Sequence, residues 1–83
     1  MDEVPTYSRE QVIAEVVRWF GEASVKGVML LLDEYQLVGG GRERVQMAIL
    51  KLSKGNLHDV RHYITQAQDD VRDVLYWAEY YGT

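Results

Sequence analysis

The sequence predicts an all-α domain of four helices, and three observations lead to this fold class. Apolar residues recur at spacings of three and four in separate stretches, which is the period of a helix face. Glycines or capping residues stand at the ends of these stretches. No two stretches alternate apolar and polar residues as paired strands would. The 83 residues fit a single domain, with residues 1–7 as a flexible lead.

The first predicted helix runs from Arg9 to Phe20. Ser8 and Gln11 have the spacing of a capping box, which places the helix start at Arg9. Gly21 supplies the stop signal. One apolar stripe lies between these ends and consists of Val12, Ile13, Val16, Val17 and Phe20.

The second predicted helix covers residues 25–37 and has Ser24 as its cap. Leu30 and Leu31 extend its apolar surface almost all the way round, which is typical of a central or interface helix. The run from Val28 to Leu32 also fits a buried strand, because periodicity cannot distinguish so short a run. A helix is favoured because no second strand is available to satisfy the backbone of the first.

The last two helices are predicted over 42–54 and 57–81, as an antiparallel hairpin. Gly55 ends the first of them, and Asn56 with Asp59 caps the second. The connection is too short for any other arrangement of neighbouring helices. The long last helix has an apolar seam made of Leu57, Val60, Ile64, Ala67, Val71, Val74, Ala78 and Tyr81.

The last helix should be longer than the domain that carries it. A straight helix over 57–81 would be about 37 Å long at about 1.5 Å per residue. A compact domain of this size is only about 30 Å across. We therefore expect the C-terminal end, with its four aromatic residues, to overhang the domain and to need a partner.

Composition limits the possible functions. Thirteen acidic and nine basic residues give a net charge of −4, which makes nucleic-acid binding an unfavoured interpretation. Cysteine is absent, so oligomerisation is the expected supplement to a small core. The apolar runs are too short for a membrane span, and the N-terminus lacks the pattern of a signal peptide. We expect a cytoplasmic protein that does not enter a membrane.

Two segments resemble a set of short, uncharacterised bacterial helical proteins. They are residues 44–52 (RVQMAILKL) and residues 72–80 (RDVLYWAEY), and the second is the more specific motif. The resemblance covers about half of the chain. It implies the helical hairpin and brings with it no activity, cofactor or catalytic residue.

Asp69, Asp70 and Asp73 form an Asp-Asp-x-x-Asp pattern on the last predicted helix. Carboxylates at these spacings on one helix can share a magnesium ion. Magnesium also needs further oxygen ligands from a facing helix. The plainer interpretation is a solvated acidic face beside Arg72, and it needs no cofactor.

A glycine-rich turn precedes the third predicted helix. Gly40 and Gly41 offer free backbone amides, and Arg42 and Arg44 follow them, so together they could hold a phosphate or a carboxylate. The Lys-Ser/Thr ending of a nucleotide triphosphate loop is missing. In the alternative, the arginines pair with protein carboxylates such as Glu34.

Four aromatic residues crowd the C-terminal end, namely Tyr76, Trp77, Tyr80 and Tyr81, and Tyr63 lies farther back. Tyr and Trp are enriched at the energetic centres of interfaces. The sequence therefore predicts a non-catalytic interaction or adaptor protein that forms a homodimer through the long helix and its aromatic end.

Two other functions stay open at this stage. One is a magnesium-dependent hydrolase of a nucleotide or diphosphate, which would use the three aspartates for the metal and the two arginines for phosphate. The other is a regulator that binds a small ligand in a pocket lined by Met29, Tyr63 and Trp77.

Overall fold

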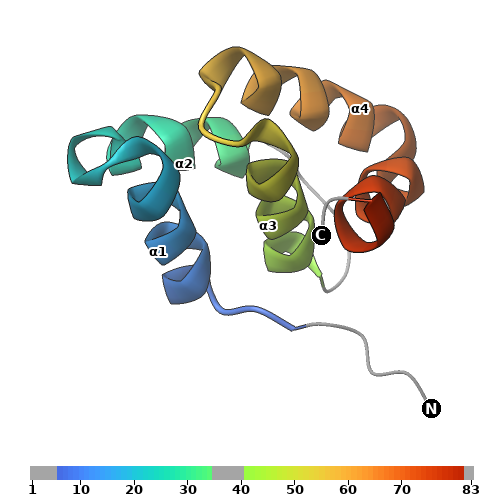
Figure 1. The fold of residues 1–83 in the computed structure, drawn as a ribbon, viewed down its shortest axis with the longest axis horizontal. Coiled ribbons are helices and arrows are strands. Elements are labelled where there is room, and N and C mark those ends of the chain that lie inside the picture. The colour runs from blue at the N-terminus through green and yellow to red at the C-terminus, as the bar shows by residue number, and fades with distance from the viewer. Residues whose placement is uncertain (1–5, 35–40, 82–83) are drawn as a thin grey trace.

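The fold is all-α, as predicted. The computed structural model describes residues 6–34 and 41–81, and no strand occurs in these two ranges (Figure 1). The elements, in chain order, are α1 (Arg9–Phe20), a 3₁₀ turn η1 (Glu22–Ser24), α2 (Val25–Asp33), α3 (Arg42–Ser53), α4 (Leu57–Tyr76) and a π-helical turn η2 (Trp77–Tyr81). The run 28–32 lies inside α2, so the strand alternative was wrong. The predicted end of the second helix falls on residues outside the described ranges.

The ends of α1 agree with the sequence prediction. The Ser8 hydroxyl accepts a hydrogen bond from the Gln11 N–H at 3.1 Å, and the Gln11 side chain accepts one from the Ser8 N–H at 2.8 Å. These two bonds satisfy two backbone N–H groups that have no acceptor within the helix, because they lie at its start. Gly21, with φ of +89°, ends the helix. Ser24 stands at the N-cap position of α2 as predicted, but its side chain makes no capping hydrogen bond, and η1 leads directly into the helix.

The turn between α3 and α4 uses backbone conformations that only some residues tolerate. Lys54 and Gly55 both have positive φ, at 49° and 83°, and the Asn56 side chain then accepts from the Asp59 N–H as predicted. A Cβ atom on Gly55 would lie 3.1 Å from the backbone oxygen of Trp19. Glycine is therefore required here both by the turn and by the close approach of α1.

The centre of the core is α3, whereas the sequence suggested a central or interface position for the second helix. Figure 1 shows α3 between α1 and the C-terminal turns. All six residues from Val45 to Leu50 are buried, so α3 is covered on every side rather than on one stripe. In contrast, Leu30 on α2 is 63% exposed. The position of a helix in the fold decided its burial, because α3 has neighbours around it and α2 does not.

The last helix is bent, so the predicted straight rod and its overhang were wrong. Asp70 has φ of −151° and ψ of 99°, which is extended rather than helical backbone. Its carboxylate accepts a hydrogen bond from the Arg72 N–H at 3.0 Å, as a helix N-cap does. The molecule measures 39 × 26 × 24 Å with a radius of gyration of 11.8 Å.

The bend returns the chain to the start of α3 and completes the predicted hairpin. The end of α3 adjoins the start of α4, while Glu79 in η2 pairs with Arg44 near the start of α3. The seam residues Val74 and Ala78 are fully buried against the same core. The aromatic end is thus attached to its own domain.

Tyr7, the last residue of the predicted flexible lead, contacts the rest of the domain. The Tyr7 ring packs on the core, and the Lys51 ammonium lies 5.6 Å from its centre in a cation–π arrangement. Residues 1–5 lie outside the described ranges. The Tyr7 ring packs here because removal of its apolar surface from water is favourable.

Candidate interaction surface

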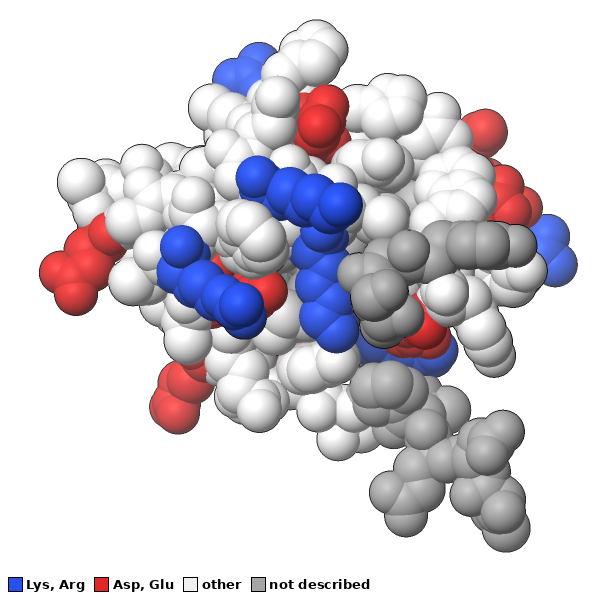
Figure 2. All heavy atoms as spheres, viewed as in Figure 1, with Lys and Arg blue, Asp and Glu red and all other residues white. Residues whose placement is uncertain are grey.

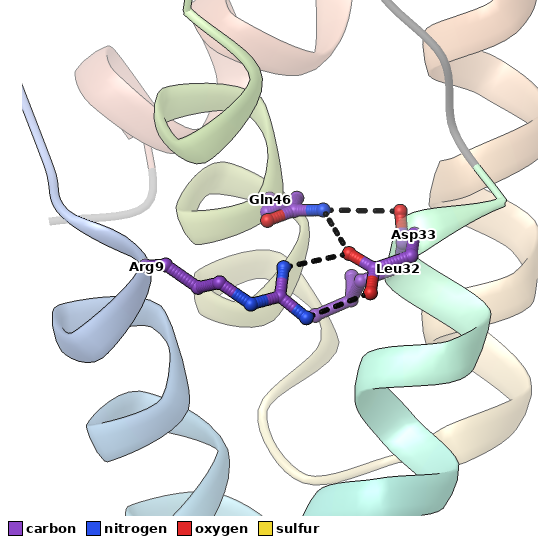
Figure 3. Close-up of polar contacts among 4 residues, drawn as sticks. All are labelled: Arg9, Leu32, Asp33 and Gln46. Carbon is purple, nitrogen blue, oxygen red and sulfur yellow. Dashed lines mark hydrogen bonds and ion pairs between the residues drawn. The ribbon is translucent and has the colours of Figure 1, made fainter.

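A polar cluster joins the first three helices and is structural in character (Figure 3). The Arg9 guanidinium on α1 donates two hydrogen bonds to the Asp33 carboxylate at the end of α2, at 3.0 and 2.8 Å. Gln46 on α3 is fully buried, and its amide nitrogen donates to the Leu32 carbonyl at 3.2 Å and to Asp33 at 3.3 Å. The hydrogen bonds from Arg9 lower the pKa of Asp33. This carboxylate is held ionised and is poorly suited to act as a base.

A second ion pair holds the C-terminal turn on α3. The Arg44 Nε donates to the Glu79 carboxylate at 2.7 Å, and a second nitrogen of the same guanidinium donates to the other oxygen. The two side chains are only 24% and 23% exposed. Hydrogen bonding from Arg44 lowers the pKa of Glu79, and Glu79 in turn raises the pKa of Arg44. A bidentate pair with little water around it fixes both position and orientation.

The structure describes three of the four residues of the candidate anion site, namely Gly41, Arg42 and Arg44. Gly41 is the N-cap of α3, with φ of +101°, and Gly40 lies outside the described residues. Arg44 is already paired with Glu79, and Arg42 contributes to the lowered pKa of Asp33. Arg44 therefore pairs with a protein carboxylate, as in the alternative interpretation, although its partner is Glu79 and not Glu34.

The three aspartates of the candidate magnesium site are not brought together. Their spacing argument assumed an unbroken helix, and the extended backbone of Asp70 interrupts it. The Asp70 carboxylate accepts hydrogen bonds from the backbone and from the guanidinium of Arg72, which lower its pKa. Within residues 6–34 and 41–81, no group of three or more His, Asp or Glu side chains is placed to hold a metal ion. The capping role of Asp70 could have been suspected from Asp73, which stands three residues later as in a capping box.

Three of the predicted aromatic residues, Tyr76, Trp77 and Tyr80, are exposed, and Tyr63 is half-buried against the core. We call these four residues the aromatic surface. The Tyr76 and Tyr80 rings lie 5.1 Å apart, as expected for residues four apart on a helix. The Trp77 ring meets Tyr63 edge to face at 6.5 Å. Trp77 is 36% exposed and Tyr80 is 71% exposed. The side chain of Tyr81 lies outside the part of the structure that is described.

A groove between α2 and α4 was not predicted from the sequence. It holds a cavity of about 400 Å³ whose apolar walls come from Phe20, Leu30, Leu31 and Leu57. A more polar cavity of about 310 Å³ adjoins it and shares Leu31, Glu34 and Arg61 with it. We call the two together the α2–α4 groove. The signals available in the sequence were Gly27 inside a predicted helix and Leu30, which extends the apolar surface of the same helix.

These cavities differ from the ligand pocket suggested by the sequence. Neither is lined by Tyr63, Trp77 or Met29. Met29 is buried in the core, and the two rings pack against each other on the surface. The structure thus separates the residues that the ligand-binding hypothesis had grouped.

Charge on the face shown in Figure 2 is mixed. Lys and Arg side chains gather over α1 and α3, with acidic side chains among them. Arg9 on α1 and Arg44 on α3 each form a bidentate pair with a carboxylate. Two of the basic groups on these helices are therefore neutralised locally.

Comparisons of the chain with models of protein families, with curated proteins and with solved structures find no match. The resemblance of residues 44–52 and 72–80 to short bacterial proteins stays a prediction. Among the helices that the structure describes, none combines the length and apolar character needed to cross a membrane.

Proposed function

We propose that this protein is a non-catalytic, cytoplasmic interaction or adaptor module that works as a homodimer. Its contact with another protein would be made by the aromatic surface. The observation that carries the proposal is that this surface is both exposed and firmly held. Tyr and Trp offer large contact areas at a low cost in side-chain entropy, which is why they dominate the energetic centres of interfaces.

The attachment of the aromatic surface supports this function. Ala78 is fully buried and Glu79 is paired with Arg44, so the inner side of η2 is anchored. Tyr80 on the same turn points into solvent. A surface that is ordered before binding loses less entropy when it binds. Short π-helical segments such as η2 also occur often at functional sites.

The homodimer part of the proposal depends on size and composition. A chain of 83 residues without cysteine has a small core and no disulfides to supplement it. Since the aromatic end does not overhang the domain, the reason for placing the dimer contact there is gone. We therefore assign the aromatic surface to a partner protein and a different surface to the contact between copies.

The proposal is tested with two matched tryptophan variants. Trp77 and Trp19 are both 36% exposed, but Trp19 lies on α1, outside the aromatic surface. Protein partners are captured by cross-linking in cells and identified by mass spectrometry, and binding of the purified partner is then measured by calorimetry. We expect Trp77→Ala combined with Tyr80→Ala to weaken binding by at least about 2 kcal/mol.

The Trp19→Ala control should bind the partner with unchanged affinity. Circular dichroism shows whether each variant is still folded. Equal affinity for wild type and for the double variant would exclude the aromatic surface as the contact. A folded Trp19→Ala variant that loses binding would move the contact to α1.

The two alternative functions gain no support from these residues. A hydrolase would require Arg44 and Asp70 to leave the partners that now occupy them, Glu79 and Arg72. A ligand pocket among Met29, Tyr63 and Trp77 would require the core and the surface rings to rearrange.

A further inference from the structure

We propose that the α2–α4 groove is the contact between two copies of this chain, packed about a two-fold axis. The inference rests on the homodimer part of the proposed function and names the surface that forms the dimer. It uses the groove rather than the aromatic surface, so that both surfaces can be occupied at once.

The groove presents apolar side chains on both of its walls. Leu30 on α2 is 63% exposed, and Leu57 at the start of α4 is 43% exposed. The α4 wall continues along one stripe through Arg61, Thr65 and Gln68, which are spaced by about one helical turn. A second helix laid along this stripe would remove both leucines from water.

Gly27 in α2 has no steric reason to be glycine within one copy. It is the third of the nine residues of α2, and alanine favours a helix more than glycine does. A Cβ atom built on it would meet no atom of the described part of the chain within 4 Å. It lines the groove. Close approach of another backbone is the usual reason for a glycine at such a position, and a second copy would supply that backbone.

The charged residues of the groove complement each other across a two-fold axis. Glu34 comes from α2 and Arg61 from α4, and both border the two cavities. Neither forms an ion pair with another residue of the described ranges. In a two-fold dimer, α2 of one copy packs on α4 of the other, so each Glu34 meets the Arg61 of the other copy. The same patch then supplies both halves of the interface, which favours a second copy over an unrelated partner.

Charge reversal tests this arrangement. Wild type, Glu34→Arg and Arg61→Glu are compared by analytical ultracentrifugation of the full chain at micromolar concentrations. We expect the wild type to be a dimer. For each single reversal we expect the dimer dissociation constant to rise at least about tenfold, because like charges then face each other. An equimolar mixture of the two variants should recover a dimer, since both cross-copy pairs are again of opposite charge.

Two further variants keep the test decisive if a reversal unfolds the chain. Leu30→Ser should give a folded monomer, whereas Tyr80→Ala should leave the dimer unchanged. A dimer that survives Glu34→Arg, Arg61→Glu and Leu30→Ser would overturn the groove contact. If Tyr80→Ala alone breaks that dimer, the contact lies at the aromatic surface and the homodimer proposal stands.

A wild-type chain that stays monomeric at about 100 μM, a weak-affinity threshold, would overturn both the groove contact and the homodimer. It would leave partner binding by the aromatic surface untouched, because the Trp77 and Trp19 variants test that binding independently. If the dimer forms and depends on the groove but the aromatic surface binds no partner, the groove contact stands and partner binding by the aromatic surface is overturned.

Discussion

The two bidentate arginine–carboxylate pairs on either side of α3 have the same chemistry and different surroundings. Arg9 and Asp33 are 50% and 34% exposed, whereas Arg44 and Glu79 are 24% and 23% exposed. Water screens the first pair, so its own contribution to stability should be small. The second pair is screened less and fixes the turn that carries the aromatic surface. Position, and not residue type, decides what an ion pair contributes.

The more exposed pair nevertheless serves a buried group. Asp33 accepts a hydrogen bond from Gln46, whose side chain is completely buried and whose Oε1 atom has no hydrogen-bond partner among residues 6–34 and 41–81. Without Asp33, the Leu32 carbonyl would be the remaining acceptor for the Gln46 amide nitrogen among the described residues. The Arg9–Asp33 pair is thus linked to a polar side chain inside the core, whereas the Arg44–Glu79 pair lies at the edge of the core.

The largest effect is expected from Gln46→Glu. This substitution puts a buried carboxylate beside Asp33 and the Leu32 carbonyl, where it can only repel or take up a proton. We expect a loss of about 3–5 kcal/mol in the free energy of unfolding, measured by urea denaturation. Gln46→Met, which keeps the size and removes the unpartnered oxygen, should lose less than about 1.5 kcal/mol. Equal losses for the two variants would contradict the electrostatic explanation.

A smaller difference should separate the two arginines. Arg44→Met leaves the Glu79 carboxylate without its partner at a poorly hydrated site, so we expect a loss of about 1–3 kcal/mol. Arg9→Met removes a pair that water already screens, and about 0.5–1 kcal/mol should be lost. For a domain of this size, each kcal/mol corresponds to a change of about 4–8 °C in Tm by calorimetry. A larger fall in Tm for Arg9→Met would reverse the comparison.

The smallest effect should come from the bend itself. Asp70→Ala removes the side-chain acceptor for the Arg72 N–H but leaves the core intact. We expect the change in Tm to be smaller than for the Gln46→Glu, Arg44→Met and Arg9→Met variants. The amides of residues 71–76 should exchange their hydrogens faster. Asp69→Ala is the matched control, because that neighbouring carboxylate caps no helix. Exchange that is unchanged in Asp70→Ala, or equally fast in both variants, would remove the capping role.

Local signals in the sequence were sufficient for most of the helix boundaries. The capping box of Ser8 and Gln11, the Asn56 cap and Gly55 act within a few residues, so their consequences do not depend on the rest of the fold. The pairing of Tyr76 with Tyr80 could be predicted for the same reason. The Ser24 side chain does not make the expected capping bond, because Ser24 is the last residue of the 3₁₀ turn η1.

The sequence by itself determined the helical class, the starts of all four α-helices and the aromatic end, since each follows from contacts between near neighbours along the chain. Only the tertiary structure decided that α3 is central, that the chain bends at Asp70, and that Arg44 meets Glu79 rather than a ligand. Those outcomes depend on which helix faces fit together in space. A helix of 57–81 can lie straight only where its whole seam finds an apolar surface, and here α3 supplies that surface only if the chain bends.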